Sequence, residues 1–251
     1  MTARPYAKAL TRVVRSAAQR LPESAHPLLA RRPEEKALLL VVSGERGLCG
    51  AFNANVIRRA LEFLRNRSSQ ATEVIALGRK GRDALRKQRW KIAAEYVNIT
   101  ARAERNRVGE IAKSIAALYE SGETDAVYIV FNEFKTVLSQ TLTLEKLLPI
   151  EFPPAAGETA APPATTVNYL YEQPPGELIA GLLPRYLEAQ IFRAIAESSA
   201  SEHAARMTAM DSATNNAVEL IDKLTLYMNK VRQAAITKEI IEVVSGAASA
   251  G

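Results

Sequence analysis

Three glycines follow an apolar run at a position where many proteins bind phosphate. Gly44, Gly47 and Gly50 come directly after residues 37–43, of which all but the last are apolar. Glycine-rich turns between a strand and a helix hold phosphate because backbone N–H groups are free there. A P-loop needs four residues between its glycines and then Lys-Ser or Lys-Thr, and a dinucleotide-binding turn needs Gly-x-Gly. The sequence has neither spacing, so it favours a structural turn over a nucleotide site.

A cysteine in the same turn could act as a nucleophile. Cys49 is the only cysteine of the 251 residues, and a catalytic thiol needs a neighbouring base. The two histidines are His26, in a proline-containing segment, and His203, in a long helical segment. Neither has an orienting carboxylate in its own element, so a packed thiol is favoured. A lone cysteine also excludes an intrachain disulfide, which fits a reducing compartment.

The remaining polar residues indicate no other active site. The histidines and the cysteine lack the spacing of a metal centre. The Asp and Glu residues are scattered along helical faces, without a pair suited to acid–base chemistry. We therefore predict a chain with no catalytic residue, no metal and no cofactor.

The chain is basic, with a net charge of +6 and a pI near 9.5. Residues 58–107 hold 14 Lys or Arg against 5 Asp or Glu, so this segment could contact nucleic acid, a membrane face or an acidic protein. It carries no recognised nucleic-acid motif. The possibility also stays open that these basic side chains simply face solvent and bind no partner. No apolar run near the start approaches the roughly 20 residues that span a bilayer, so we expect any membrane association to be peripheral.

The apolar pattern predicts an α/β fold: a Rossmann-like, doubly wound domain plus a long C-terminal coiled-coil helix. Strands are expected at 37–43, 73–77 and 125–134, with 135–147 returning as a hairpin, and helices at 1–20, 53–66 (capped by Asn53), 80–88 and 102–120. Residues 152–166, rich in Pro and Ala, are predicted to form an exposed loop. The predicted parts are an N-terminal helix and loop over 1–36, an α/β foot domain over 37–172 and a shaft helix over 173–251.

The last quarter of the chain predicts one very long helix. Residues 185–245 contain neither Gly nor Pro over 61 residues. One helix of that length extends about 90 Å, too long to lie on a small domain. Small or apolar side chains recur in alternating steps of three and four at Met207, Met210, Thr214, Ala217, Ile221, Leu224, Met228, Val231 and Ala235. This spacing is typical of a left-handed coiled-coil seam.

The end of this segment is apolar almost all round. Ile240, Ile241, Val243 and Val244 leave little polar surface on the predicted helix. A helix that is apolar on all sides has to be buried by something. We expect either another protein or a second copy of the chain to bury this tip.

Several segments together are similar to one protein family. Residues 236–247 read Ile-Thr-Lys-Glu-Ile-Ile-Glu and then end in small residues, and they are joined by similar segments at 46–53, 183–186, 200–207 and 229–234. The segment at 46–53 holds the glycine–cysteine motif with Gly47, Cys49 and Gly50. From about Arg4 to its end, the chain resembles the γ subunit of F-type ATP synthases.

The resemblance implies a rotor rather than a catalyst. In that family the α/β domain is a foot on the membrane c ring, and the long helix enters the hexamer of α and β subunits, where catalysis takes place. The implied partners are α, β, ε and the c ring, without nucleic acid and with membrane contact only through partners. The implied contacts with the β subunits and the hydrophobic bearing are Arg232, Gln233, Thr237, Glu239, Ile240, Ile241 and Val244. The implied location is the cytoplasmic face of a bacterial inner membrane, since a lone cysteine lacks the pair of the chloroplast redox switch.

One departure from the family concerns the start of the chain. Family members begin with a basic helix that pairs antiparallel with the C-terminal helix, whereas this sequence resembles the family only from just after that helix. Three explanations of this difference stay open: the start site is assigned too late, the chain is a fragment, or another chain supplies the helix. The first is favoured. Without that helix the seam is expected to be exposed on one side, which favours self-association.

Two alternative functions make different predictions. An enzyme that uses a nucleotide at the glycine turn would bind nucleotide saturably. A coiled-coil protein that binds nucleic acid through residues 58–107 would lose affinity steeply with salt.

Overall fold

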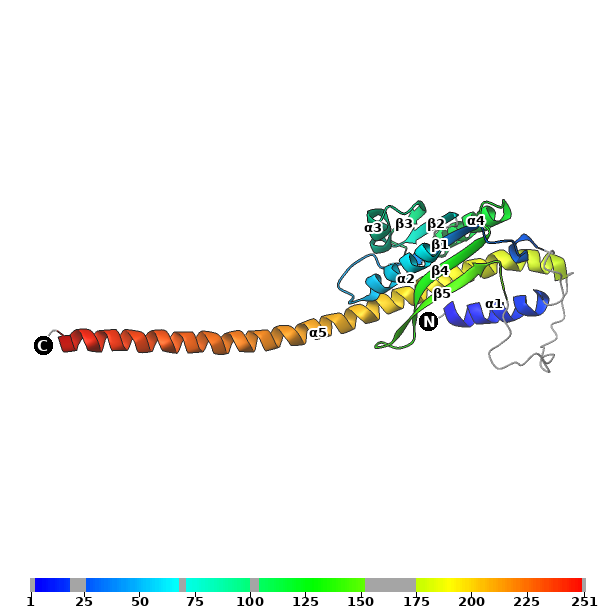
Figure 1. Cartoon of the computed structure of the whole chain (residues 1–251). Helices are drawn as coiled ribbons and strands as arrows, with labels where there is room; N and C mark the ends of the chain where they lie inside the picture. The colour runs from blue at the N-terminus through cyan, green and yellow to red at the C-terminus, as the bar shows by residue number, and fades with distance from the viewer. Residues whose placement is uncertain (1–2, 19–25, 68–70, 100–103, 152–174, 250–251) are drawn as a thin grey trace. The chain divides into compact units, whose positions relative to one another are not determined.

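The structure is a computed structural model that describes residues 3–18, 26–67, 71–99, 104–151 and 175–249. The chain divides into two compact units, Met1–Arg206 and Met207–Gly251. The first unit contains a β-sheet with helices, and the described part of the second unit belongs to one helix, α5 (Pro175–Ser249), which begins in the first unit (Figure 1).

A five-stranded sheet with the order β3-β2-β1-β4-β5 forms the centre of the first unit. Its strands are β1 (Lys36–Val42), β2 (Ala71–Leu77), β3 (Ile92–Tyr96), β4 (Ala126–Phe134) and β5 (Gln140–Leu148). β1 pairs in parallel with β2 and β4, and β2 pairs in parallel with β3. β4 and β5 form an antiparallel hairpin. The mixed α/β sheet and the long C-terminal helix confirm the predicted fold class.

Helices pack on both faces of this sheet. Besides α5 they are α1 (Ala3–Ala18), the short 3₁₀ helix η2 (Pro27–Leu29), α2 (Phe52–Asn66), α3 (Arg79–Lys87) and α4 (Arg105–Glu120). One buried cluster joins α2 and α3 to Leu39 and Val41 of β1, and the other joins α1, α4 and α5 to Leu38 and Leu40. Both faces of β1 are therefore buried, which is why its sequence is apolar without interruption.

Two local predictions are wrong. The sequence pattern misses β3, because this short edge strand alternates between exposed and half-buried residues and includes the charged Glu95. Asn53 is not the N-cap of α2; Ala51 occupies that position without a side-chain hydrogen bond. Asn53 lies inside the first turn, where its side chain accepts a hydrogen bond from the Gly44 N–H at 2.8 Å and donates to the Arg46 carbonyl at 3.1 Å.

α5 begins earlier than the segment free of Gly and Pro indicates. It starts at Pro175 and continues through Pro184, although a proline inside a helix removes a backbone hydrogen bond. Ile179, Leu183 and Leu187 are buried in the core of the first unit. This burial stabilises the first turns of α5, which lie before the segment that the sequence predicts to be helical.

Some predictions fall on residues that are not described. The predicted loop at 152–166 and the predicted boundary between 172 and 173 lie outside the described residues. The predicted limits of the foot and shaft domains stay a prediction.

Candidate functional site

The second unit exposes many large apolar side chains. The predicted seam contributes Met207, Met210, Ile221, Leu224, Met228 and Val231, and other positions contribute Val218, Leu220, Leu226, Tyr227, Ile236, Ile240, Ile241, Val243 and Val244. Most of them are more than half exposed; Ile221 is 61% exposed and Val243 is 72% exposed. Apolar surface of this extent marks an interaction site. Because it lies on several sides of the helix, this surface is wider than a two-helix seam requires.

The contact residues implied by the resemblance lie on this exposed segment. Arg232, Gln233, Thr237, Glu239, Ile240, Ile241 and Val244 are all exposed. The Thr237 hydroxyl donates to the Gln233 carbonyl of its own helix at 2.8 Å. Within the described residues, Arg232 and Glu239 form no ion pair, so both charges are available to a partner. The structure places these residues on one helix and leaves their partners open.

The glycine–cysteine motif forms a tight turn between β1 and α2. Leu48 and Gly50 have positive φ angles of 59° and 54°. Cys49 is buried and contacts Asn53, whose side-chain amide donates to its sulfur at 3.1 Å. Burial and the nearby Glu202 carboxylate raise the pKa of the Cys49 thiol. A raised thiol pKa disfavours the thiolate, which is the reactive form.

Neither histidine is in place as a base for Cys49. The His26 side chain caps η2, where its Nδ1 accepts a hydrogen bond from the Leu28 N–H at 3.2 Å, and burial lowers its pKa. His203 is exposed on α5. The polar contacts of Cys49 are with Asn53 and the Arg46 carbonyl. The arrangement is that of a packed thiol rather than a nucleophile.

The crevice where this strand order normally binds a ligand is filled by α5. Strands β2 and β4 lie on opposite sides of β1, and ligands of doubly wound sheets bind at the carboxyl ends of the strands at such a switch point. At this edge Ser198, Ser201 and Glu202 of α5 are buried. The sequence analysis assigned no role in this crevice to the three residues. Their polar side chains on one face of a helix would have been the signal for such a role.

Part of the basic charge in residues 58–107 is paired within the fold. Among the described residues of this segment, basic side chains form the ion pairs Arg59–Glu62, Arg67–Glu34, Arg82–Asp83, Arg86–Glu95 and Lys91–Glu73. Such pairing lowers the charge left for phosphate groups, on which affinity for nucleic acid depends.

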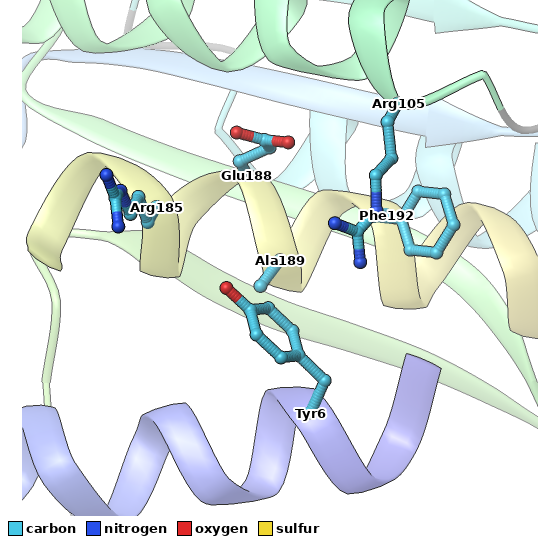
Figure 2. Close-up of a pocket in the computed structure, with 6 residues that line it drawn as sticks. All are labelled: Tyr6, Arg105, Arg185, Glu188, Ala189 and Phe192. Atoms are coloured by element: carbon cyan, nitrogen blue, oxygen red, sulfur yellow. The ribbon is translucent and has the colours of Figure 1, made fainter. Parts of the chain in front are cut away.

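A cavity of about 260 Å³ lies among α1, α4 and α5 in the first unit (Figure 2). It is lined by Tyr6, Arg105, Arg185, Glu188, Ala189 and Phe192. The Arg105 guanidinium lies 5.6 Å from the centroid of the Tyr6 ring and 5.7 Å from that of the Phe192 ring, so cation–π contacts hold it in place. These six lining residues include neither histidine nor cysteine, and they offer no pair of nucleophile and base.

The described part of the chain offers neither a metal centre nor a membrane span. No three of its His, Cys, Asp or Glu side chains gather closely enough to hold a metal ion. None of its helices combines the length and the hydrophobicity needed to cross a bilayer.

Comparison with known proteins identifies the family. A family model described as ATP synthase matches residues 1–250. The chain is 50% identical over 254 residues to the ATP synthase gamma chain of Solibacter usitatus, covering 100% of this chain and 86% of that one. It is 46% identical over 251 residues to the gamma chain of Geobacter metallireducens, covering 99% and 85%. The chain belongs to the ATP synthase γ chain family.

Solved structures of ATP synthases share the fold of this γ chain. A chain of the Euglena gracilis mitochondrial ATP synthase, in an assembly of OSCP, F1 and c-ring, matches with a TM-score of 0.65 at 19% identity, over 99% of this chain and 91% of that one. A chain of the Tetrahymena thermophila mitochondrial central stalk and c-ring matches with a TM-score of 0.57 at 21% identity, over 83% and 99%. As a γ chain, this protein is a central-stalk subunit of an F-type ATP synthase.

Proposed function

We propose that this γ chain is the rotor of a proton-translocating F-type ATP synthase. It couples rotation of the membrane c ring to changes of nucleotide state in the hexamer of α and β subunits. It performs no bond chemistry itself. The observation that carries the proposal is the exposed apolar segment of α5 after Arg206, in a chain of the γ family.

The physical reason is that this segment needs a partner surface around it. Side chains from Met207 to Val244 are apolar on several sides, and water contact with such a surface is unfavourable. A surrounding ring of subunits buries all sides, whereas a single flat partner buries one. The helix presents different polar groups on different sides, such as Arg232 and Glu239. Each group would then favour a different nucleotide state of the subunit that it faces. Coupling requires such contacts, whose free energy differs between the states.

The proposed partners are the α and β subunits, ε and the c ring. Arg232, Gln233, Thr237 and Glu239 would meet the β subunits, and Ile240, Ile241 and Val244 would lie in an apolar bearing. The protein would be peripheral, on the cytoplasmic face of a bacterial inner membrane, in line with its bacterial relatives.

Purification from source membranes tests the proposed function. The tagged chain is isolated under mild solubilisation, and the mass of every recovered component is measured. We expect α, β, ε and c subunits to be recovered with it. Recovery of the chain alone, or with nucleic acid, would overturn the rotor function.

Substitutions in the apolar tip test the proposed bearing. Ile240→Asp with Ile241→Asp introduces charges where an apolar sleeve is expected, and burying each unpaired charge is strongly unfavourable. We expect ATP synthesis by membrane vesicles to fall by more than about tenfold, while Glu123→Gln, which removes an exposed carboxylate from the first unit, changes it little. Equal activity of both variants would contradict a buried tip.

A further inference from the structure

The cavity among α1, α4 and α5 is lined by two arginines that lie apart from each other. Figure 2 shows Arg185 and Arg105 on opposite sides of Ala189 and the Tyr6 hydroxyl. Arg105 lies beside Phe192, and Phe192 follows Arg185 on α5 by about two helical turns, or about 10 Å along the helix axis. Ala189 has only a methyl group as its side chain, so the middle of the cavity stays open.

Two aromatic rings fix the position of the Arg105 charge. The guanidinium carbon lies 5.6 Å from the centroid of the Tyr6 ring and 5.7 Å from that of the Phe192 ring. Cation–π contacts of this kind engage the charge but not the N–H groups, which stay available as hydrogen-bond donors. The fold therefore positions this guanidinium without neutralising it.

No acidic neighbour neutralises either arginine. Within the described part of the chain, neither Arg105 nor Arg185 forms an ion pair. Glu188 is the only carboxylate of the cavity lining, and it lies against α4, since a Cβ atom on Gly109 would be 3.8 Å from its carboxyl carbon. The lining thus has an excess of positive charge. Two like charges beside one cavity repel each other, and an anion between them would relieve this repulsion.

We propose that this cavity binds a small molecule with an anionic group at each end, a dicarboxylate or a bisphosphate with a short apolar middle. Arg105 and Arg185 would each donate charge-assisted hydrogen bonds to one end. The Ala189 methyl group would contact the middle, and the Tyr6 hydroxyl would donate a further hydrogen bond.

The size and position of the cavity fit such a ligand. Its volume of about 260 Å³ lies just below the range of pockets for drug-sized molecules, so it suits a smaller one. Both arginines are exposed, so a ligand can enter from solvent. All lining residues belong to the first unit, and the site would therefore exist whether or not the chain acts as a rotor.

Two probes of equal length test the need for two anionic ends. Adipate has a carboxylate at both ends, and hexanoate has the same number of carbons with a carboxylate at one end. Saturation-transfer NMR on the full-length chain, at low protein concentration, measures the affinity for each probe. We expect adipate to bind about tenfold more tightly than hexanoate, because it gains a second charge-assisted hydrogen bond.

Removal of either arginine should abolish this preference. In Arg105→Gln and in Arg185→Gln, we expect the ratio of the two affinities to fall to about twofold or less, since one end of adipate then lacks its partner. The control is Arg58→Gln, which removes an exposed arginine of α2 that does not line the cavity. It lowers the net charge by the same amount and should leave the ratio unchanged.

Each outcome decides the proposal. Equal affinity for adipate and hexanoate overturns it, as does binding of neither probe or a preference that survives in both cavity variants. Each variant supplies its own ratio, so a general loss of stability does not imitate the expected result, and if one variant does not fold, the other decides. Hexanediol bisphosphate then identifies the anionic ends: tighter binding than adipate indicates phosphate ends, and weaker binding indicates carboxylate ends.

Discussion

At the residue scale, the network around Glu34 is the one with the clearest dependence on pH. Its carboxylate accepts hydrogen bonds from Arg67 at 2.7 Å and from the Tyr128 hydroxyl at 2.9 Å, and it forms an ion pair with Lys146 at 2.9 Å. Burial alone would raise the pKa of Glu34, but these three partners together lower it from 4.5 to about 2. A carboxyl group whose pKa is lowered by folding stabilises the folded state above its unfolded pKa, and this contribution is lost as the pH falls toward the folded value.

Glu34→Gln should therefore destabilise the protein at neutral pH more than in acid. We expect the free energy of unfolding to fall by about 2 kcal/mol at pH 7, because the shift is partly screened by solvent. The difference from the unmodified chain should shrink as the pH is lowered from about 5 to about 3. Urea unfolding at each pH measures this, with the exposed Glu123→Gln as the control. A loss of stability that does not change with pH would show that packing, not charge, explains the effect.

At the scale of the element, α5 has two parts with different environments. Ile191 is fully buried in the first unit, whereas Ile221 in the second unit is 61% exposed. The same residue type in the same helix therefore has two roles: one stabilises the fold, and the other is available to a partner.

The two isoleucines make a matched test. Ile191→Ala removes buried methyl groups and should lower the free energy of unfolding of the first unit by about 2–5 kcal/mol. Ile221→Ala should change it by no more than about 0.5 kcal/mol, as exposed positions usually do. Denaturant unfolding of the chain at low concentration gives both values. Similar losses for the two variants would mean that Ile221 is already covered in the free chain.

At the scale of the whole molecule, the free chain should associate with itself. Its second unit exposes apolar side chains from Met207 to Val244, an amount of apolar surface that monomeric proteins rarely show. The net charge of +6 opposes association only weakly at physiological salt. Sedimentation velocity at several concentrations measures the oligomeric state, and a single monomeric species at every concentration would disprove the prediction. Addition of the α and β subunits should reverse the association if they cover the same surface.

The sequence alone determined the features that depend on neighbours along the chain. The apolar run of β1, the hairpin of β4 and β5 and the uninterrupted helix over residues 185–245 each follow from the types of residues that are neighbours along the chain. The family resemblance came from short segments such as residues 236–247, and the comparisons confirm it. The partner contacts at Arg232 to Val244 stay a prediction, since exposure alone does not name a partner.

Only the tertiary structure decided the features that join distant residues. Gly44 and Glu202 meet across most of the chain, and no local pattern records such a contact. α5 begins before Pro184 because Ile179 and Leu183 are buried by the sheet, and this burial outweighs the cost of a proline in a helix. β3 forms because β2 offers it a free edge, although its own sequence is a weak strand signal. In each case the deciding free energy comes from contacts that exist only once the chain has folded.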